Sequence, residues 1–171
     1  MFYQTDIRNM PIGYHQGFTL MQLVITMSLV ATLTFLAVPS YNQSIANSRM
    51  DSNNNSLANA IGLARVEAIK RGTHVAVKPT NILWKNGISV WVDDDRDGVI
   101  DSTEVVLKKF QPFQGTATVT TSSNSVIFKS SGFADAAASF LICDDRSGET
   151  GRSLTILISG RIRSIEDNTC T

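Results

Sequence analysis

The chain has 171 residues, and its 15 basic and 15 acidic side chains leave no formal net charge at pH 7. This balance gives no overall attraction to nucleic acid or anionic lipid, so binding of that kind would need a local cluster of basic residues. Once an N-terminal segment and a membrane anchor are set aside, about 130 residues remain, which is enough for one domain with its own hydrophobic core.

An uncharged, mostly apolar run covers residues 18–38 and is closed by Pro39. As a helix rising about 1.5 Å per residue, this run would be roughly 30 Å long, which matches the hydrocarbon core of a bilayer. The sequence therefore predicts a single transmembrane helix near the N-terminus. The segment before it has little pattern, and Pro11 and Gly13 break any helix there.

Residues 40–72 are expected to continue as a helix that lies on a globular head. Apolar residues recur at spacings of three and four, so one face should be buried, with Leu57, Ile61, Ala64 and Ala68 on it. Gly72 can supply a left-handed cap at the helix C-terminus. The run Asn53-Asn54-Asn55 predicts a weak point, because asparagine has a low helix propensity.

From residue 73 to residue 171 the pattern changes to short runs rich in β-branched and aromatic residues, separated by turn-forming residues. Eight strands are expected, at residues 74–78, 88–92, 105–110, 116–121, 125–129, 139–143, 154–159 and 161–165. Antiparallel strands that follow one long helix predict an α+β head in which a sheet packs on that helix. Ser159-Gly160 predicts a tight hairpin turn between the last two strands, because Gly adopts a positive φ at little cost.

The N-terminal motif resembles that of type IV prepilins. Gly17 is followed by Phe18-Thr19-Leu20, an uncharged helix and a proline. In that family a dedicated prepilin peptidase cuts after the Gly on the cytoplasmic face and methylates the new N-terminal Phe, whereas an ordinary signal peptide is cut after its apolar region. The resemblance implies a leader over residues 1–17, a transmembrane and assembly helix over residues 18–39 and a head over residues 40–171.

Gln22 is the one departure from the prepilin pattern, because the family usually has Glu at the fifth mature position. In pilins that carboxylate meets the N-terminal amine of a neighbouring subunit. An amide can still form a hydrogen bond there but cannot form a charge-assisted pair. Gln22 and Pro39 are thus expected to be assembly residues, with Gln22 pointing to an unusual position such as the tip of a pilus.

Two parts of the head resemble the GspH and FimT/FimU branch of minor pilins and pseudopilins. The first is the stretch over residues 63–72, and the second combines residues 141–144, 151–154 and 159–163 with a final Cys170. The resemblance implies a type IV pilin-like fold and assembly with other major and minor pilins. It also implies an inner-membrane protein with a periplasmic head, which becomes extracellular when the subunit joins a pilus.

Cys143 and Cys170 both lie in the part of the chain expected outside the cytoplasm, where disulfides persist. We therefore expect them to be bonded. The bond would close a loop of about 28 residues and stabilise the head by roughly 3.5 kcal/mol on the chain-entropy account. The alternative is two free thiols, one of them at a loose C-terminus.

A Gly-Arg-x-Arg motif places Arg161 and Arg163 directly after Gly160. Residues two apart on a strand point to the same side, so both guanidinium groups would project together and suit phosphate oxygens. In proteins of the FimT type this motif is associated with DNA capture during natural transformation, which makes double-stranded DNA a candidate partner and Arg152 a further candidate residue. The alternative is that the two arginines only keep an edge strand soluble. Nearby acidic side chains could also neutralise the charge of the two arginines: Asp144, Asp145, Glu149, Glu166 and Asp167.

An acidic segment over residues 93–104 matches the calcium-loop template D-x-[DN]-x-[DN]-G-x₅-E. Its candidate ligands are Asp93, Asp95, Asp97, the carbonyl of Val99, Asp101 and Glu104. Hard oxygen donors at this spacing suit Ca²⁺, and Gly98 occupies the position of the sharp turn. The flanking residues resemble strands and not the helices of an EF-hand, so the alternative is an acidic hairpin loop that binds no cation.

The sequence does not indicate an enzyme. His74 is the only histidine outside the expected leader, and no catalytic triad, Walker loop or zinc-ligand spacing can be assembled. We therefore expect a minor type IV pilin of the FimT/FimU kind that takes part in pilus assembly, with DNA binding as a further hypothesis and no cofactor other than calcium. Two alternatives stay open: a type II secretion pseudopilin of the GspH kind, and a membrane-anchored calcium-binding surface protein.

Overall fold

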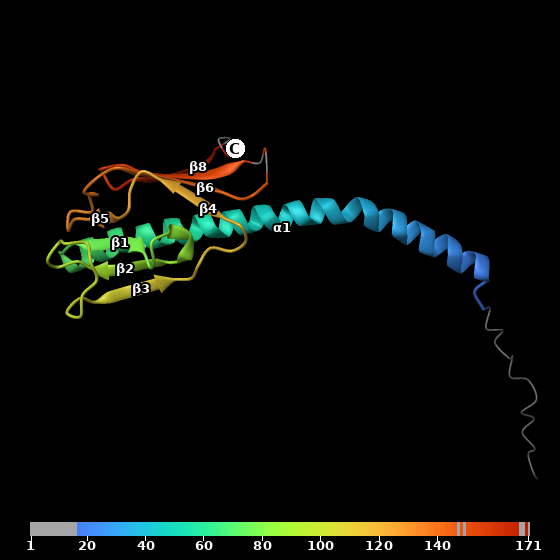
Figure 1. Cartoon of the computed structure of the whole chain (residues 1–171), viewed down its shortest axis with the longest axis horizontal. Helices are drawn as coiled ribbons and strands as arrows, with labels where there is room; N and C mark the ends of the chain where they lie inside the picture. The colour runs from blue at the N-terminus through green and yellow to red at the C-terminus, as the bar shows by residue number, and fades with distance from the viewer. Residues whose placement is uncertain (1–16, 147, 149, 168–169, 171) are drawn as a thin grey trace, which may run out of the picture. The chain divides into compact units, whose positions relative to one another are not determined.

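The computed structural model describes residues 17–146, 148, 150–167 and 170, and in these residues one long helix precedes eight strands (Figure 1). The helix α1 spans Leu20–Arg71, and the short 3₁₀ helix η1 spans Trp84–Asn86. The strands are β1 (Val75–Pro79), β2 (Ile88–Val92), β3 (Val106–Phe110), β4 (Thr118–Thr121), β5 (Val126–Phe128), β6 (Ala138–Cys143), β7 (Gly151–Ile156) and β8 (Ile162–Asp167). Each expected strand is present, with its ends shifted by at most a few residues.

The chain divides into two compact units, Met1–Asn42 and Gln43–Thr171, and α1 contributes residues to both. The expected boundary between anchor and head lay three residues earlier, at residues 39 and 40. The described part of the first unit is the start of α1, where Thr19 acts as the N-cap because its hydroxyl accepts a hydrogen bond from the backbone N–H of Gln22 at 3.2 Å. The helix consequently begins at Leu20 and not at Phe18.

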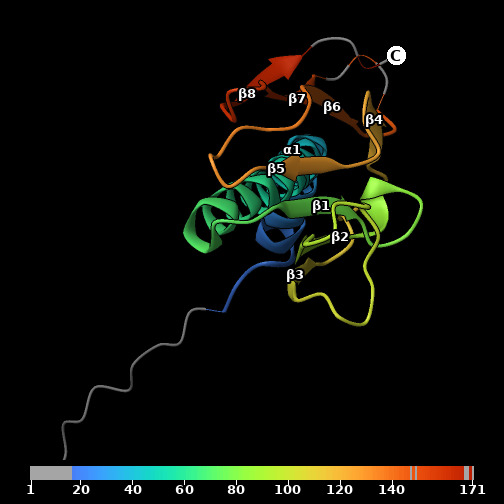
Figure 2. The same ribbon diagram turned by 90° about the vertical axis from the view of Figure 1, so that its left-hand side faces the viewer.

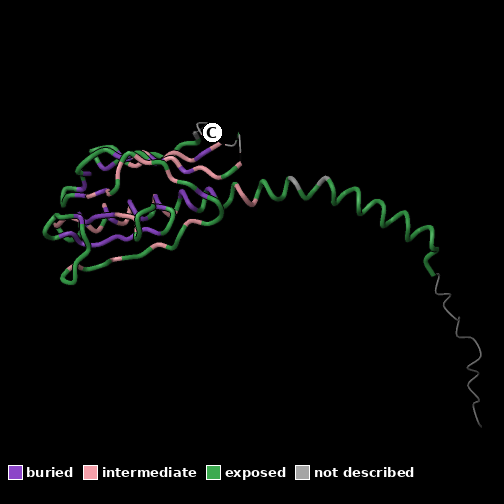
Figure 3. Tube along the Cα trace, viewed as in Figure 1, coloured by how far each residue is buried: buried purple, intermediate pink, exposed green. Residues whose placement is uncertain are grey.

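In the first unit, the residues of α1 whose burial is described are exposed (Figure 3). Among the described residues, α1 is the helix that is long and apolar enough to cross a membrane, by length and composition. Its hydroxyl groups donate hydrogen bonds to backbone carbonyls three or four residues earlier in the same helix, and these donors are Thr26, Ser28, Thr32 and Thr34. Because these polar atoms are satisfied within the helix, they do not oppose burial in lipid.

The head contains two antiparallel sheets, whereas the sequence predicted one. The strand order is β3-β2-β1-β5 in the first sheet and β4-β6-β7-β8 in the second, and strands of both sheets pack with α1 in one core (Figure 2). The chain leaves the first sheet after β3, starts the second with β4 and returns to the edge of the first with β5. This alternation depends on which distant strands pair, and alternation of apolar residues within a strand does not contain that information.

The core lies between α1 and the two sheets. On α1 the expected apolar face is confirmed, because Leu57, Ile61, Ala64 and Ala68 are fully buried. The strands contribute Ile88, Phe128 and Phe140 to this core, whereas Trp91 on β2 is fully buried but is not a member of the cluster. Within this core, Phe140 meets the ring of Trp84 edge-to-face, with 4.7 Å between ring centroids.

The asparagine run, whose helix propensity is low, lies within α1 and attaches this helix to distant segments. Asn53 is buried and exchanges two hydrogen bonds with the backbone of Gln114, at 2.9 and 3.0 Å. The side chain of Asn54, also buried, donates to the hydroxyl of Ser164 on β8 at 2.8 Å. These bonds with distant segments offset the low helix propensity of asparagine. At the end of α1, Gly72 adopts a φ of 70° and its N–H donates to the carbonyl of Ala68, as expected.

Candidate functional site

The prepilin motif lies at the very start of the described chain. Gly17 and Phe18 precede the helix, and Phe18 is 84% exposed. Gln22 lies in the first turn of α1 with an exposed side chain, and Pro39 lies within α1. The expected leader falls outside the described residues, apart from Gly17. The bond between Gly17 and Phe18 therefore lies in an exposed, non-helical stretch.

The Gly-Arg-x-Arg motif belongs to a hairpin that we call the basic hairpin: β7, the turn at residues 157–161, and β8. The turn is closed by a hydrogen bond from the N–H of Gly160 to the carbonyl of Leu157 at 2.8 Å, and Gly160 adopts a φ of 76°. A turn of this kind, with a left-handed residue at its end, is a common three-residue hairpin connection. The expected hairpin is confirmed, and Ser159-Gly160 forms part of its turn.

Gly160 is also the point where three distant segments meet. A Cβ atom at this position would collide with the carbonyl oxygen of Gly132 and would lie 2.8 Å from the Nε of Arg65 on α1. Arg65 itself donates hydrogen bonds to the carbonyls of Gly132 at 3.0 Å and of Ser159 at 3.4 Å. Gly160, the first residue of the motif, is therefore fixed by packing. Arg65 holds the turn in position, and the sequence around Arg65 gave no sign of this role.

Arg163 lies on β8, and Arg161 is the last residue of the turn that precedes this strand. Because residues two apart in an extended chain point to the same side, we place both on the outer face of the second sheet. Arg163 pairs with Thr155 across the hairpin, and Arg161 is paired with Leu157 through a backbone hydrogen bond of 3.0 Å. The alternate positions, occupied by Leu154 and other core residues, face α1. Both arginines are exposed, and within the described residues neither guanidinium group forms a hydrogen bond or an ion pair.

Arg152 does not join this pair. It lies at a helix-facing position of β7, opposite Glu166, at the far end of the basic hairpin. Its Nε is 2.7 Å from a carboxylate oxygen of Asp51 on α1, and its guanidinium is 3.5 Å from Glu166. Because its charge is already paired within the fold, Arg152 connects α1 to the second sheet. The structure thus separates it from Arg161 and Arg163.

The nearby acidic side chains that are described have other partners. Asp144 pairs with Arg146 at 2.7 Å, Asp145 accepts a hydrogen bond from Thr116, and Glu166 faces Arg152. Glu149 and the side chain of Asp167 lie outside the described residues. In the part of the head that the structure describes, no acidic side chain forms an ion pair with Arg161 or Arg163.

The acidic segment forms a loop between β2 and β3 that we call the acidic loop, residues 93–104. One carboxylate oxygen from each of Asp93, Asp95 and Asp97 lies within 4.8 Å of the other two. Asp93 is fully buried, and one of its oxygens accepts a hydrogen bond from the N–H of Gly98 at 3.3 Å. Gly98 adopts the left-handed conformation, with a φ of 68°. The flanks are strands, as expected, and the loop is therefore not an EF-hand.

The acidic loop also perturbs its own carboxyl groups. Burial raises the pKa of Asp93 above its ordinary value, and the nearby charges of Asp95 and Asp97 add to this. Burial likewise raises the pKa of Glu104, with a further contribution from Asp93. By contrast, hydrogen bonds from the hydroxyl and the N–H of Thr103 lower the pKa of Asp101.

The expected disulfide between Cys143 and Cys170 is present, with 5.8 Å between the two Cα atoms. It joins the end of β6 to the segment beyond β8. Gly151 lies beneath the bond, since a Cβ atom there would contact the Sγ of Cys170. The disulfide therefore fixes the end of the basic hairpin that is opposite its turn.

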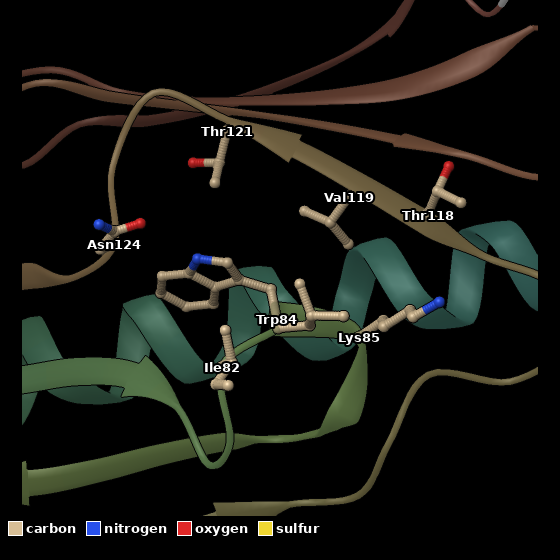
Figure 4. Close-up of a pocket in the computed structure, with 8 residues that line it drawn as sticks. Ile82, Trp84, Lys85, Thr118, Val119, Thr121 and Asn124 are labelled. Carbon is tan, nitrogen blue, oxygen red and sulfur yellow. The ribbon is translucent and has the colours of Figure 1, made fainter.

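A pocket of about 280 Å³ lies between η1 and β4 (Figure 4). It is lined from the segment around η1 by Ile82, Leu83, Trp84 and Lys85. The other lining residues are Thr118, Val119, Thr121 and Asn124. Lys85 is the one titratable side chain among them, so this pocket offers no acid–base pair for catalysis.

Solved structures with this fold define the class of protein. The crystal structure of the type IV minor pilin FimU from Pseudomonas aeruginosa is 21% identical, covers 76% of this chain and 98% of its own, and has a TM-score of 0.56. The minor pseudopilin EpsH from the type 2 secretion system of Vibrio cholerae is 12% identical, with 69% and 97% covered and a TM-score of 0.53. The solution structure of GspH from Escherichia coli is 16% identical, with 72% and 92% covered and a TM-score of 0.51. The fold is therefore that of a pilin-like protein.

The sequence then identifies the family. The family model of the type II transport protein GspH matches residues 53–161, which is more than half of the chain. The protein therefore belongs to the GspH family of minor pilins and pseudopilins. A comparison with curated protein sequences finds no significant match.

Proposed function

We propose that this protein is a minor pilin that is held in the inner membrane by residues 18–39 and enters a type IV pilus by packing that helix against those of other pilins. The observation that carries the proposal is the start of α1. Its described side chains are exposed, its hydroxyl groups are satisfied internally, and it is joined to a head with a core of its own. A helix of this kind needs apolar neighbours, which lipid or other pilin helices supply.

Processing by a prepilin peptidase is part of this proposal. The Gly17–Phe18 bond precedes the first turn of α1 and is exposed, so a protease can reach an extended backbone there. Mass spectrometry of the protein from its native membrane should show a chain that begins at a methylated Phe18. The variant Gly17→Glu should keep residues 1–17, whereas Gln22→Glu, a change in the same motif, should still be cut. An uncut wild-type chain would contradict the proposal.

The alternative is a type II secretion pseudopilin, which the shared fold and the family name also support. A strain that lacks this gene separates the two functions. Loss of surface pili with protein secretion intact is the outcome expected of a minor pilin, and complementation with the wild-type gene should restore the pili. Loss of secretion with pili intact would assign the protein to a secretion system. A free-standing surface protein would show neither defect and would not need Gly17 for processing.

We further propose that Arg161 and Arg163 bind the phosphates of double-stranded DNA. Both side chains are exposed on one face, and the described acids near them are paired elsewhere. The turn at Gly160 is fixed by Arg65 and Gly132, so the end of the turn and the start of β8, which carry the two arginines, are held in place. Two guanidinium groups neutralise about two phosphates, which predicts weak and salt-sensitive binding to a single head. Several heads in one pilus would raise the affinity by avidity.

The test is a titration of duplex DNA with the full chain in detergent micelles, followed by fluorescence anisotropy at several salt concentrations. Replacing Arg161 and Arg163 by alanine should reduce the slope of log K against log salt concentration by about 1.8. The matched control is Lys108→Ala/Lys109→Ala, which removes two exposed cations from β3 in the first sheet. An equal loss of DNA affinity in both double variants would show that binding depends only on the net charge of the protein. The assignment of the site to Arg161 and Arg163 would then be wrong.

A further inference from the structure

The acidic loop contains two buried carboxylate oxygens that lack a hydrogen-bond partner among the described residues. They are the Oδ2 of Asp93, at the first position of the loop, and the Oε1 of Glu104, at the last. The whole Asp93 side chain is fully buried. A buried carboxylate oxygen without a partner is costly, and proteins relieve this cost with a proton donor or a cation.

Two other carboxylates of the loop lie close to Asp93. Its carboxylate and those of Asp95 and Asp97 bring three oxygens within 4.8 Å of one another. At the far end of the loop, Glu104 folds back so that its second oxygen accepts a hydrogen bond from the N–H of Asp101 at 3.3 Å. The unpartnered oxygens of Asp93 and Glu104 thus come from the two ends of one acidic loop, and the charge of Asp93 acts unfavourably on the ionised form of Glu104.

The basic residues around the loop do not neutralise it. Lys78 on β1 donates a hydrogen bond to the carbonyl of Gly98 at 3.0 Å and not to a carboxylate. Arg96 is exposed on the loop itself. The hydroxyl of Thr73 and the backbone of His74 contact only Asp94 and the N–H of Asp93. In the described part of the chain, no lysine or arginine forms an ion pair with these acids.

We propose that the acidic loop binds one Ca²⁺ between β2 and β3, with Asp93, Asp95, Asp97 and Glu104 as its carboxylate ligands. The Val99 carbonyl and Asp101, which fall at the seventh and ninth positions of the loop, complete the set. Calcium accepts six to eight oxygen ligands in a flexible geometry, whereas Mg²⁺ requires a near-ideal octahedron and keeps several waters. A loop that brings three carboxylates together and carries further oxygen donors matches the first requirement.

The bound cation would hold the connection between β2 and β3 in one conformation. Extracellular calcium sites have dissociation constants of about 10⁻⁴–10⁻³ M, so a site of this kind fills outside the cytoplasm, where calcium is in the millimolar range. The loop would then be ordered only after the head has left the cytoplasm. This inference does not depend on whether the protein serves a pilus or a secretion system.

The test uses the full chain in detergent micelles with CaCl₂, followed by isothermal titration calorimetry and by thermal unfolding. Glu104→Gln and Asp97→Asn remove one charge each, at a half-buried and an exposed ligand position. The matched control is Asp94→Asn, which removes the same charge from the same loop at a position outside the ligand set. Its amide can still accept the hydrogen bond from Thr73.

We expect one site per chain and a rise in Tm of about 3–6 °C between EDTA and millimolar calcium. Glu104→Gln and Asp97→Asn should each weaken calcium binding at least about tenfold while the protein stays folded in EDTA, and Asp94→Asn should bind within about twofold of the wild type. The proposal is overturned by the absence of saturable binding, by an equal loss in Asp94→Asn, or by Mg²⁺ binding as tightly as Ca²⁺.

Discussion

The basic hairpin and the acidic loop differ in how far their charged side chains are buried. In the basic hairpin, Arg161 and Arg163 point to solvent from an outer face, and the contacts that fix the turn are made by Gly160, whose close packing leaves no room for a side chain. In the acidic loop, Asp93 is buried and one of its oxygens has no hydrogen-bond partner in the described chain.

An exposed charge and a buried charge differ in what they cost the fold and in how a ligand can reach them. An exposed guanidinium keeps its hydration, so its presence costs the fold little and it is available to a ligand that approaches from outside. A buried carboxylate loses hydration during folding, and each of its oxygens needs a proton, a hydrogen-bond donor or a cation beside it. The basic hairpin therefore needs no ligand for its charges, whereas on our proposal the acidic loop is completed by a cation.

The turn of the basic hairpin should be the part of the head least tolerant of substitution. In Gly160→Ala, the added Cβ would collide with the Gly132 carbonyl, and alanine is also strained at a φ of 76°. We expect a loss of about 4 kcal/mol in the free energy of unfolding, measured by denaturant titration. Gly72→Ala is the matched control, because Gly72 has a similar φ of 70° with open space around it. It should lose only about 1 kcal/mol, and equal losses would show that conformation alone matters.

The disulfide fixes the other end of the same hairpin and gives the next largest effect. Replacing Cys143 and Cys170 by serine should lower the free energy of unfolding by about 3.5 kcal/mol, because the unfolded chain regains the entropy of an open loop. Denaturant titration of the oxidised wild type, the reduced wild type and the double variant measures this. The last two should agree, and a double variant as stable as the oxidised protein would show that the hairpin is held by its turn alone.

Local signals in the sequence were enough to predict the elements of both regions. The spacing of Leu57, Ile61, Ala64 and Ala68 predicted the buried face of α1, because a helix repeats every 3.6 residues and needs no distant partner to do so. The strands on either side of the acidic loop, and the turn at Gly160, could be located in the same way. The pairing of Cys143 with Cys170 followed from there being only two cysteines in the chain.

Contacts between distant segments could not be predicted. Arg152 was grouped with the other arginines, yet its partner Asp51 lies 101 residues away in the chain. Asn53 seemed unfavourable in a helix because its partner Gln114 is 61 residues away. The division into two sheets and the approach of Gly132 to Gly160 are of the same kind. Each depends on the folded arrangement, and a helical or strand periodicity contains no information about it.

The calcium-free acidic loop should become more stable when its buried charge is removed. In EDTA at pH 7, Asp93→Asn should raise the free energy of unfolding by about 1 kcal/mol, because the amide keeps an acceptor for the N–H of Gly98 and carries no charge. In calcium the order should reverse, since the variant lacks a ligand. Thermal unfolding in both buffers gives the comparison, and a variant less stable than the wild type in EDTA would contradict this account of the loop.

The acidic loop also predicts how the free energy of unfolding in EDTA depends on pH. Because the pKa of Asp93 is raised by burial, the folded protein holds this proton more tightly than the unfolded chain does. The contribution of Asp93 to stability in EDTA should therefore increase as pH falls from 7 through the raised pKa toward the ordinary value. The advantage of Asp93→Asn should shrink over that window. A constant difference between variant and wild type from pH 7 to pH 4 would show that Asp93 does not titrate there.

The smallest effect on stability is expected at the arginines that we assign to DNA. Arg161→Ala/Arg163→Ala should change the free energy of unfolding by no more than about 0.5 kcal/mol, because both side chains are exposed and make no described polar contact. Arg152→Ala, a change of the same type on the same hairpin, should lose about 1.5 kcal/mol because it breaks the contact with Asp51. Denaturant titration of the two variants provides the measurement. If the double variant lost as much as Arg152→Ala, the two arginines would have a structural role, and any loss of DNA binding in that variant could no longer be attributed to phosphate contacts.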